Sequence, residues 1–163
     1  MSGPVTITLE RPADYEEWRA AARRLVAAKV SPERTGFRLA AASGDLFDAF
    51  GDSGTQHPVS GSRAIRVPQE FPALAKAVIC HSDAARFALL YRLLWRLQRE
   101  PRLLDNVADI DVYAARRIAK AVRRDMHKMK AFVRFRRAMV DGQEWFIAWY
   151  RPDHYILHRV AGF

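Results

Sequence analysis

Residues 111–150, DVYAARRIAKAVRRDMHKMKAFVRFRRAMVDGQEWFIAWY, contain the clearest structural signals in the chain. Apolar residues at helical spacing predict a helix from Asp111 to about Met129. Residues 132–140 then alternate as in a strand, Asp141-Gly142 is a strong two-residue hairpin turn, and residues 143–150 return as the second strand. A long helix that leads directly into a hairpin indicates an α+β fold.

The predicted helix has an apolar side and a basic side. Its apolar stripe consists of Ile118, Val122, Met126 and Met129. Five basic residues recur on the other side at spacings of four and three, which keeps them on one face: Arg116, Lys120, Arg123, His127 and Lys130. A membrane-surface helix has the same two-sided pattern, but this apolar stripe is narrow and has no Trp or Phe at interfacial positions. We therefore expect no membrane contact.

The excess positive charge of the protein is concentrated in one window. The chain has 27 Lys and Arg against 18 Asp and Glu, a formal net charge of +9. Ten of these cations and a single acid, Asp125, lie within residues 116–137, so the remaining 17 cations and 17 acids balance. The ten are Arg116, Arg117, Lys120, Arg123, Arg124, Lys128, Lys130, Arg134, Arg136 and Arg137.

This localised charge favours binding to a polyanion. Clustered cations focus an electrostatic field, whereas scattered charge chiefly aids solubility. A solvated helix face is the alternative interpretation, but the window is rich in Arg, and without interleaved acids its cations repel one another. We therefore expect nucleic acid to bind a surface made of Arg116, Lys120, Arg123, Arg124, His127, Lys128, Lys130, Arg134 and Arg136.

The N-terminal part of the chain predicts strands and one helix. Residues 5–9 alternate β-branched and polar side chains, which is typical of a short strand. Asp14 and Glu17 are spaced as a capping box that begins a helix over about residues 14–29. Residues 37–41 are a weaker strand prediction.

The middle of the chain predicts a loop followed by two helices. Residues 46–50 form a single predicted turn, and residues 51–62, rich in Gly and Ser, form a predicted mobile loop. Helices are expected over residues 68–81 and 84–99, and the apolar set of the second is broad enough for a central core helix. Three arginines fall on one strip of that helix, where they either pair with carboxylates or extend an anion-binding surface: Arg92, Arg96 and Arg99. A last helix is expected to start at Pro152-Asp153.

Together these segments predict a single α+β domain over residues 1–163. The sheet is expected to be small and antiparallel, made of residues 5–9, 132–140 and 143–150, with three or four helices packed on it. A length of 163 residues suits one domain with a real core.

Composition and motifs exclude several classes of protein. No apolar run approaches the roughly 20 residues that span a bilayer, and the N-terminus does not resemble a secretory signal. Cys80 is the only cysteine, so the chain has no internal disulfide, zinc cage or iron–sulfur cluster, and a reduced, cytoplasmic setting is expected. The common phosphate-loop, dinucleotide, metalloprotease and nucleophile-elbow motifs are absent. We expect no cofactor and no bound metal.

Asp125, His127 and Lys128 are the residues that most resemble an acid–base cluster, with His154 as a further candidate. Asp125 and His127 are two positions apart on a helix and point to different sides, which makes a poor metal pair. We expect Asp125 to pair with the surrounding arginines and His127 to contribute to the phosphate-binding surface. Catalysis by these residues is the alternative to binding alone.

Three blocks resemble a bacterial family described as DNA metabolism proteins: FALLYRLLWRL at residues 87–97, AKAVRRDMHKMKAFVRFR at 119–136 and FIAWYRPDHYIL at 146–157. The likeness covers nearly the whole chain after the first strand, and RRDxHKMxAFVRFR is its specific motif. The family is a domain of unknown function, often encoded beside a radical-SAM repair-like protein and sometimes fused ahead of a UdgX-type uracil-DNA glycosylase-like domain. Its characteristic positions fall on Arg123, Arg124, Asp125, His127, Lys128, Met129, Phe132, Arg134, Trp149, Pro152 and His154.

The resemblance implies a role in DNA repair or modification. DNA, a radical-SAM protein and a fused uracil-DNA glycosylase domain are the partners that it implies. Family members continue beyond the segment that ends here at residues 161–163, so the chain is expected to be the N-terminal part of a longer family domain. It lacks the four cysteines of that glycosylase's iron–sulfur cluster, so uracil excision is not expected of these residues.

Three functions follow as hypotheses. The first is a nucleic-acid-binding accessory domain that contacts the phosphate backbone through the basic helix and hairpin. The second is a DNA-processing enzyme domain, a nuclease, a lyase or a glycosylase-associated activity, that uses His127, Lys128 and Asp125. The third is a docking module whose basic face binds an acidic protein partner in repair.

Overall fold

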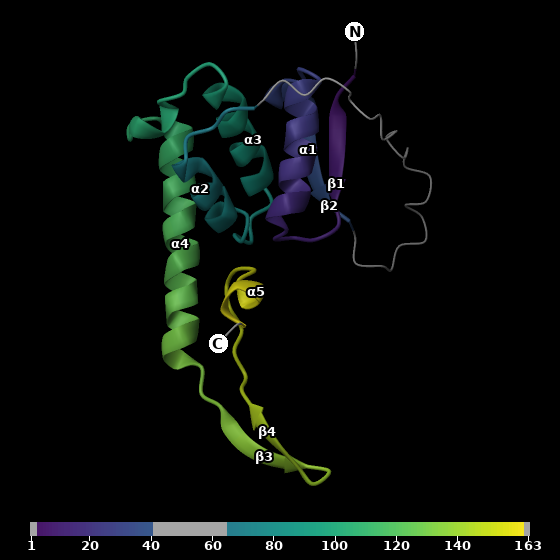
Figure 1. Cartoon of the computed structure of the whole chain (residues 1–163), viewed down its shortest axis with the longest axis vertical. Coiled ribbons are helices and arrows are strands. Elements are labelled where there is room, and N and C mark those ends of the chain that lie inside the picture. The colour runs from purple at the N-terminus through teal and green to yellow at the C-terminus, as the bar shows by residue number, and fades with distance from the viewer. Residues whose placement is uncertain (1–2, 41–64, 162–163) are drawn as a thin grey trace.

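The computed structural model of the protein describes residues 3–40 and 65–161 (Figure 1). The predicted turn at residues 46–50 and the predicted loop at residues 51–62 lie outside the described residues. Helices, short 3-10 helices (η) and strands follow in the order β1 (Val5–Leu9), α1 (Tyr15–Ala27), η1 (Pro32–Arg34), β2 (Thr35–Leu39), α2 (Glu70–Val78), α3 (Arg86–Leu97), η3 (Leu103–Asp105), α4 (Ile110–Phe132), β3 (Arg136–Val140), β4 (Gln143–Ile147) and α5 (Leu157–Val160). This combination of helices with small sheets confirms the α+β class.

The described strands form two separate sheets. β1 pairs in parallel with β2, and β3 pairs antiparallel with β4. The expectation of one antiparallel sheet that joins residues 5–9 to the hairpin is therefore wrong. The reason is connectivity: α1 crosses over between β1 and β2, which permits a parallel pair, whereas the hairpin follows the far end of α4 (Figure 1).

The start of α1 shows how local polar groups set a helix boundary. The side chain of Asp14 accepts a hydrogen bond from the backbone N–H of Glu17 at 3.0 Å, as the capping-box pattern predicts. The carboxylate of Glu17 does not close the box on Asp14. It accepts the N–H groups of Glu10 and Arg11 at 2.6 Å and 3.2 Å, and so holds the loop after β1 against the helix.

The C-terminal elements differ from their predicted bounds. α4 continues past Met129 to Phe132, since no Gly or Pro interrupts it there, and the first hairpin strand is correspondingly shorter. Asp141 and Gly142 have φ values of 50° and 77°, in the left-handed region that a two-residue hairpin turn requires. The last helix begins at Leu157, later than predicted.

α3 is the buried centre of the helical body. The broad apolar set of this helix is buried: Phe87, Leu90, Tyr91, Leu94 and Leu97. α1, α2, α4 and β2 all contact α3, so the prediction of a central core helix is confirmed. The hydroxyl of Tyr91 donates to the carbonyl of Val30 at 2.6 Å, and burial raises its pKa. Among the described residues, no helix has the length and apolarity that crossing a bilayer requires.

Arg86, at the start of α3, is a charged residue inside this body and is 1% exposed. Its guanidinium donates to the carbonyls of Ile79 and Asp83, each at 2.8 Å, and to that of Pro12. It also lies over the ring of Phe87, 4.0 Å from the centroid. One side chain thus joins the N-terminal loop, the end of α2 and the start of α3.

Replacement of Arg86 should destabilise the whole body. Arg86→Met leaves several buried carbonyls without a donor, so the free energy of unfolding should fall by about 2–4 kcal/mol. Urea denaturation followed by circular dichroism measures this change. Arg102→Met is the control, because the side chain of Arg102 is 91% exposed, and its effect should stay within about 0.5 kcal/mol. Equal stability of the two variants would show that the buried guanidinium is dispensable.

Candidate nucleic-acid interface

The ten cations of residues 116–137 are all exposed to solvent. Those on α4 lie away from the side that packs on the body, where Ala115, Ala119 and Val122 are buried. The predicted apolar stripe is confirmed, since its members pack in or against the core: Ile118, Val122, Met126 and Met129. The basic side of α4 is therefore available to an external ligand.

The cations of α4 form two adjoining strips. The five residues predicted to share one face are all exposed, and they make the first strip. Arg117, Arg124 and Lys128 make a second strip, which helical geometry places about 100° further round the axis. We call the two strips together the basic face: Arg116, Arg117, Lys120, Arg123, Arg124, His127, Lys128 and Lys130.

The basic charge continues into the root of the hairpin. Arg134 donates to the carbonyls of Ala131 and Val133 at 2.7 Å and 3.0 Å, which places its guanidinium at the negative end of the α4 dipole. Arg136 is exposed on β3, and Arg137 forms an ion pair with Glu144 on β4. Figure 1 shows the hairpin extending from the end of α4. The cations of the window therefore follow one another along the chain from the helix into the hairpin.

The arginines of α3 behave differently from those of α4. Arg92 pairs with Asp111 at 2.8 Å, and Arg96 pairs with Asp109 at 2.7 Å. The Arg96 guanidinium holds the pKa of the Asp109 carboxyl below its ordinary value. These pairs tie α3 to the first turn of α4. Of the two alternatives that the sequence left open, Arg92 and Arg96 therefore follow the first, pairing with carboxylates of the chain.

Asp125 does not lie in the basic face. It is 4% exposed, and its Oδ2 accepts a hydrogen bond from the backbone N–H of His154 at 2.9 Å. Among the described residues, the expectation that Asp125 pairs with surrounding arginines is therefore wrong. The reason is its position on the helix, which turns the carboxylate inward toward the returning C-terminal segment. The only acid of the basic window thus points away from the basic face.

The three catalytic candidates are not brought together. Asp125 is buried, whereas His127 and Lys128 are exposed and lie on the first and the second strip of the basic face. Consecutive residues of a helix are about 100° apart, so these side chains diverge from one another. Among residues 3–40 and 65–161, no group of three or more His, Cys, Asp or Glu has the arrangement to hold a metal ion.

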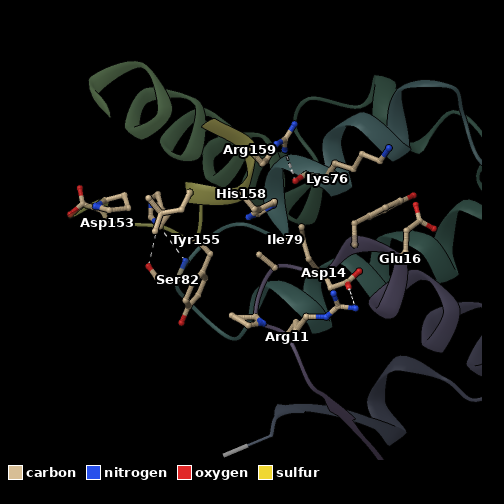
Figure 2. A pocket seen from close by; sticks show the side chains of 16 residues that line it. Arg11, Asp14, Glu16, Lys76, Ile79, Ser82, Asp153, Tyr155, His158 and Arg159 are labelled. Carbon is tan, nitrogen blue, oxygen red and sulfur yellow. Dashed lines mark hydrogen bonds and ion pairs between the residues drawn. The ribbon is translucent and has the colours of Figure 1, made fainter. Parts of the chain in front are cut away.

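A cavity of about 930 Å³ lies beside the C-terminal segment (Figure 2). Its walls come from three parts of the chain: residues 11–16 at the start of α1, residues 76–82 around the end of α2, and residues 152–159. The cations around it have partners of their own: Arg11 pairs with Asp14 at 2.6 Å, and Lys76 lies over the ring of Tyr15. Both cations are therefore engaged by groups of the chain itself.

A cluster at the edge of this cavity was not foreseen from the sequence. Nδ1 of His154 lies 3.2 Å from the hydroxyl of Ser82 and accepts the backbone N–H of Ser82 at 3.3 Å. The ring of His154 also lies 4.3 Å from that of His81, centroid to centroid. Ser82 and His154 are 72 positions apart, so no local pattern could reveal the contact. A Ser–His pair can serve nucleophilic catalysis. Here, however, Nδ1 of His154 also accepts a backbone N–H, so the contact anchors the C-terminal segment to the turn after α2.

Residues 84–163 match the family model of DUF4130, a domain of unknown function. The DUF4130 segment contains α3, α4 with the basic face, the hairpin and α5. No curated protein and no solved structure matched the chain. His154 lies inside the DUF4130 segment, whereas His81 and Ser82 lie outside it, so the cluster joins the matched and unmatched parts of the protein.

Removing the acceptor at Asp125 should loosen the C-terminal part of the DUF4130 segment. Asp125→Ala leaves the N–H of His154 unsatisfied, which should lower the free energy of unfolding by about 1–3 kcal/mol and speed hydrogen exchange over residues 151–160. Asp125→Asn keeps an acceptor oxygen and should retain most of the protection. Asp105→Ala, at an exposed ion pair, is the control and should change neither quantity. Unchanged exchange in Asp125→Ala would contradict the anchoring role.

Acidification should destabilise the protein through His81. Burial first, and then the charge of His154, lower its pKa, as do Arg86 and Arg117, while Asp83 opposes them. Because the folded-state pKa lies below the ordinary value near 6.5, the unfolded chain takes up the proton first. The contribution of neutral His81 to the free energy of unfolding is therefore complete above about pH 6.5, and it is lost as the pH falls through the folded-state pKa.

Thermal unfolding between about pH 8 and about pH 5 tests the contribution of His81. The wild-type Tm should decline on acidification, and His81→Asn should reduce the decline, because Asn keeps an acceptor for the N–H of Asp83 but does not titrate. The same decline in both proteins would assign the acid sensitivity to other groups.

Proposed function

We propose that this protein is a cytoplasmic nucleic-acid-binding accessory domain of bacterial DNA repair or modification, and that it grips the phosphate backbone through α4 and the root of the hairpin. One observation carries the proposal: ten cations within 22 consecutive residues are all exposed on a helix and hairpin, while the only acid among them faces the interior. Phosphates spaced along a nucleic acid strand are the natural counter-charge for such a surface.

The contrast with the rest of the molecule supports this reading. On the helical body, Arg92 and Arg96 lie against carboxylates of the chain itself. A purely solvated basic helix would gain stability from interleaved acids at positions three or four residues away, and α4 has almost none. The absence of such acids from the window favours an external anion over a role in solubility alone.

The sequence blocks described above supply the biological context. Their likeness to DNA metabolism proteins favours DNA over RNA and favours repair or modification as the setting. Phosphate contacts position a protein without reading bases, so we expect little sequence preference. Asp125, His127 and Lys128 diverge on α4, so binding is a better supported function than catalysis by these three residues.

Salt dependence of binding tests the proposal. Fluorescence anisotropy of a labelled oligonucleotide at several salt concentrations should show log affinity falling linearly with log salt, by about 0.7–0.9 for each phosphate contacted. Lys120→Gln/Arg123→Gln should weaken binding about tenfold or more and lower the slope by about 1–2, equally for unrelated sequences. Arg99→Gln/Arg102→Gln removes the same charge outside the basic window and should leave the affinity within about twofold.

Two outcomes would overturn this function. One is binding that salt does not weaken, or no binding to any oligonucleotide. The other is an equal loss of affinity in both double variants, which would indicate an effect of net charge rather than of the basic face. Pull-down with and without nuclease treatment separates an acidic protein partner from DNA, since a partner retained after digestion favours protein docking.

A further inference from the structure

The hairpin at the end of α4 exposes its large apolar side chains. Nine of the ten residues of β3 and β4 are exposed, and the tenth, Ala138, is only half-buried. The exposed fraction is 53% for Trp145, 63% for Phe146 and 94% for Trp149, which follows β4. Strand aromatics usually serve to build a core, and a lone two-stranded hairpin is marginally stable. Within the described part of the chain, these rings are therefore not packed into a core, as such residues normally are.

Each face of the hairpin combines aromatic and cationic groups. The pairing of Arg136 with Ile147 and of Ala138 with Trp145 places these four residues on one face. The pairing of Arg137 with Phe146 places a second ring and a second guanidinium on the other face. On each face, an aromatic ring therefore lies directly opposite an arginine or diagonally across from one.

We propose that the exposed rings of the hairpin stack on unpaired bases while the basic face holds the adjoining phosphates, so that the protein prefers single-stranded to duplex DNA. This inference rests on the proposed function and adds the strand form. Single-strand-binding proteins combine the same two features, a positively charged track for the backbone and aromatic side chains for the bases. In a duplex the base faces are already stacked, so the rings have nothing to bind.

Charge complementarity favours nucleic acid over a second copy of the chain. Residues 134–137 carry three arginines, and the basic face adjoins them directly. Two hairpins packed on each other would bring these like charges together, whereas a nucleic acid strand offers anions and apolar ring faces at once.

The tip of the hairpin argues against a lipid surface. Asp141, Gln143 and Glu144 lie at or beside the turn and are exposed. They would enter an anionic bilayer first, and both carboxylates would be repelled there. The rings of Phe135 and Trp149 lie instead at the root of the hairpin, next to the end of α4 and its basic face.

The test compares three probes of equal length: a single-stranded oligonucleotide, its duplex, and an abasic deoxyribose-phosphate chain. The variants are Trp149→Ala, which removes a ring that is 94% exposed and so leaves the fold intact, and Trp145→Ala/Trp149→Ala. Tyr113→Ala is the matched control, because Tyr113 is an aromatic residue that is 61% exposed but lies outside the hairpin. Thermal unfolding checks that each variant is folded.

We expect the wild-type protein to bind the single strand about tenfold or more tightly than the duplex or the abasic chain. Trp149→Ala should weaken single-strand binding severalfold and the double variant about tenfold or more, with an unchanged salt slope. Binding to the abasic chain should stay within about twofold, and Tyr113→Ala should match the wild type. Lys120→Gln/Arg123→Gln, in contrast, should weaken all three probes.

The outcomes separate this inference from the proposed function. Equal, salt-sensitive binding of all three probes would overturn base stacking and leave phosphate binding in place. No binding to any probe would overturn both. The stacking inference also fails if the tryptophan variants bind the single strand as the wild type does. If these variants instead lose self-association in sedimentation, the hairpin packs against a second copy of the chain. If they lose binding to phosphatidylserine vesicles, the hairpin contacts a lipid surface.

Discussion

The arrangement of the molecule depends on the buried guanidinium of Arg86. By donating to carbonyls of the N-terminal loop and of the turn after α2, it fixes the backbone from which His81 and Ser82 project. Those two residues hold the ring of His154, and the backbone of His154 in turn binds Asp125 on α4. A chain of polar contacts therefore runs from the core to the far half of the helix that carries the basic face.

This chain of contacts explains why a buried acid occurs within a strongly basic segment. An exposed carboxylate among ten cations would neutralise neighbouring guanidinium groups and reduce the field that the segment presents. Turned inward, the same carboxylate satisfies a backbone donor and closes the C-terminal segment onto α4. Asp125 and His154, both characteristic positions in the resemblance noted from the sequence, are thus coupled to each other, and the coupling is structural.

The charges of the protein are divided between two kinds of surface. On the helical body, arginines meet carboxylates within hydrogen-bonding distance, and the pairs between α3 and the start of α4 reinforce the packing of those helices. α4 packs on the body through one side, and its cations are exposed on the other. The large rings of the hairpin are also exposed, and among the described strands β3 and β4 pair only with each other. Charge and exposed aromatic surface therefore accumulate at the same end of the molecule.

Local periodicity was sufficient to locate α1, α3, α4 and the hairpin turn, because apolar spacing, the Asp14 cap and the Asp-Gly pair act over a few neighbouring residues. It was also sufficient for the basic side of α4, since residues at helical spacing share a face whatever the helix packs against. The parallel pairing of β1 with β2, the inward carboxylate of Asp125 and the Ser82–His154 contact required the folded chain. Each of these joins residues that are 29 or more positions apart, and such contacts are selected by the packing of whole elements, about which a short stretch of sequence carries no information.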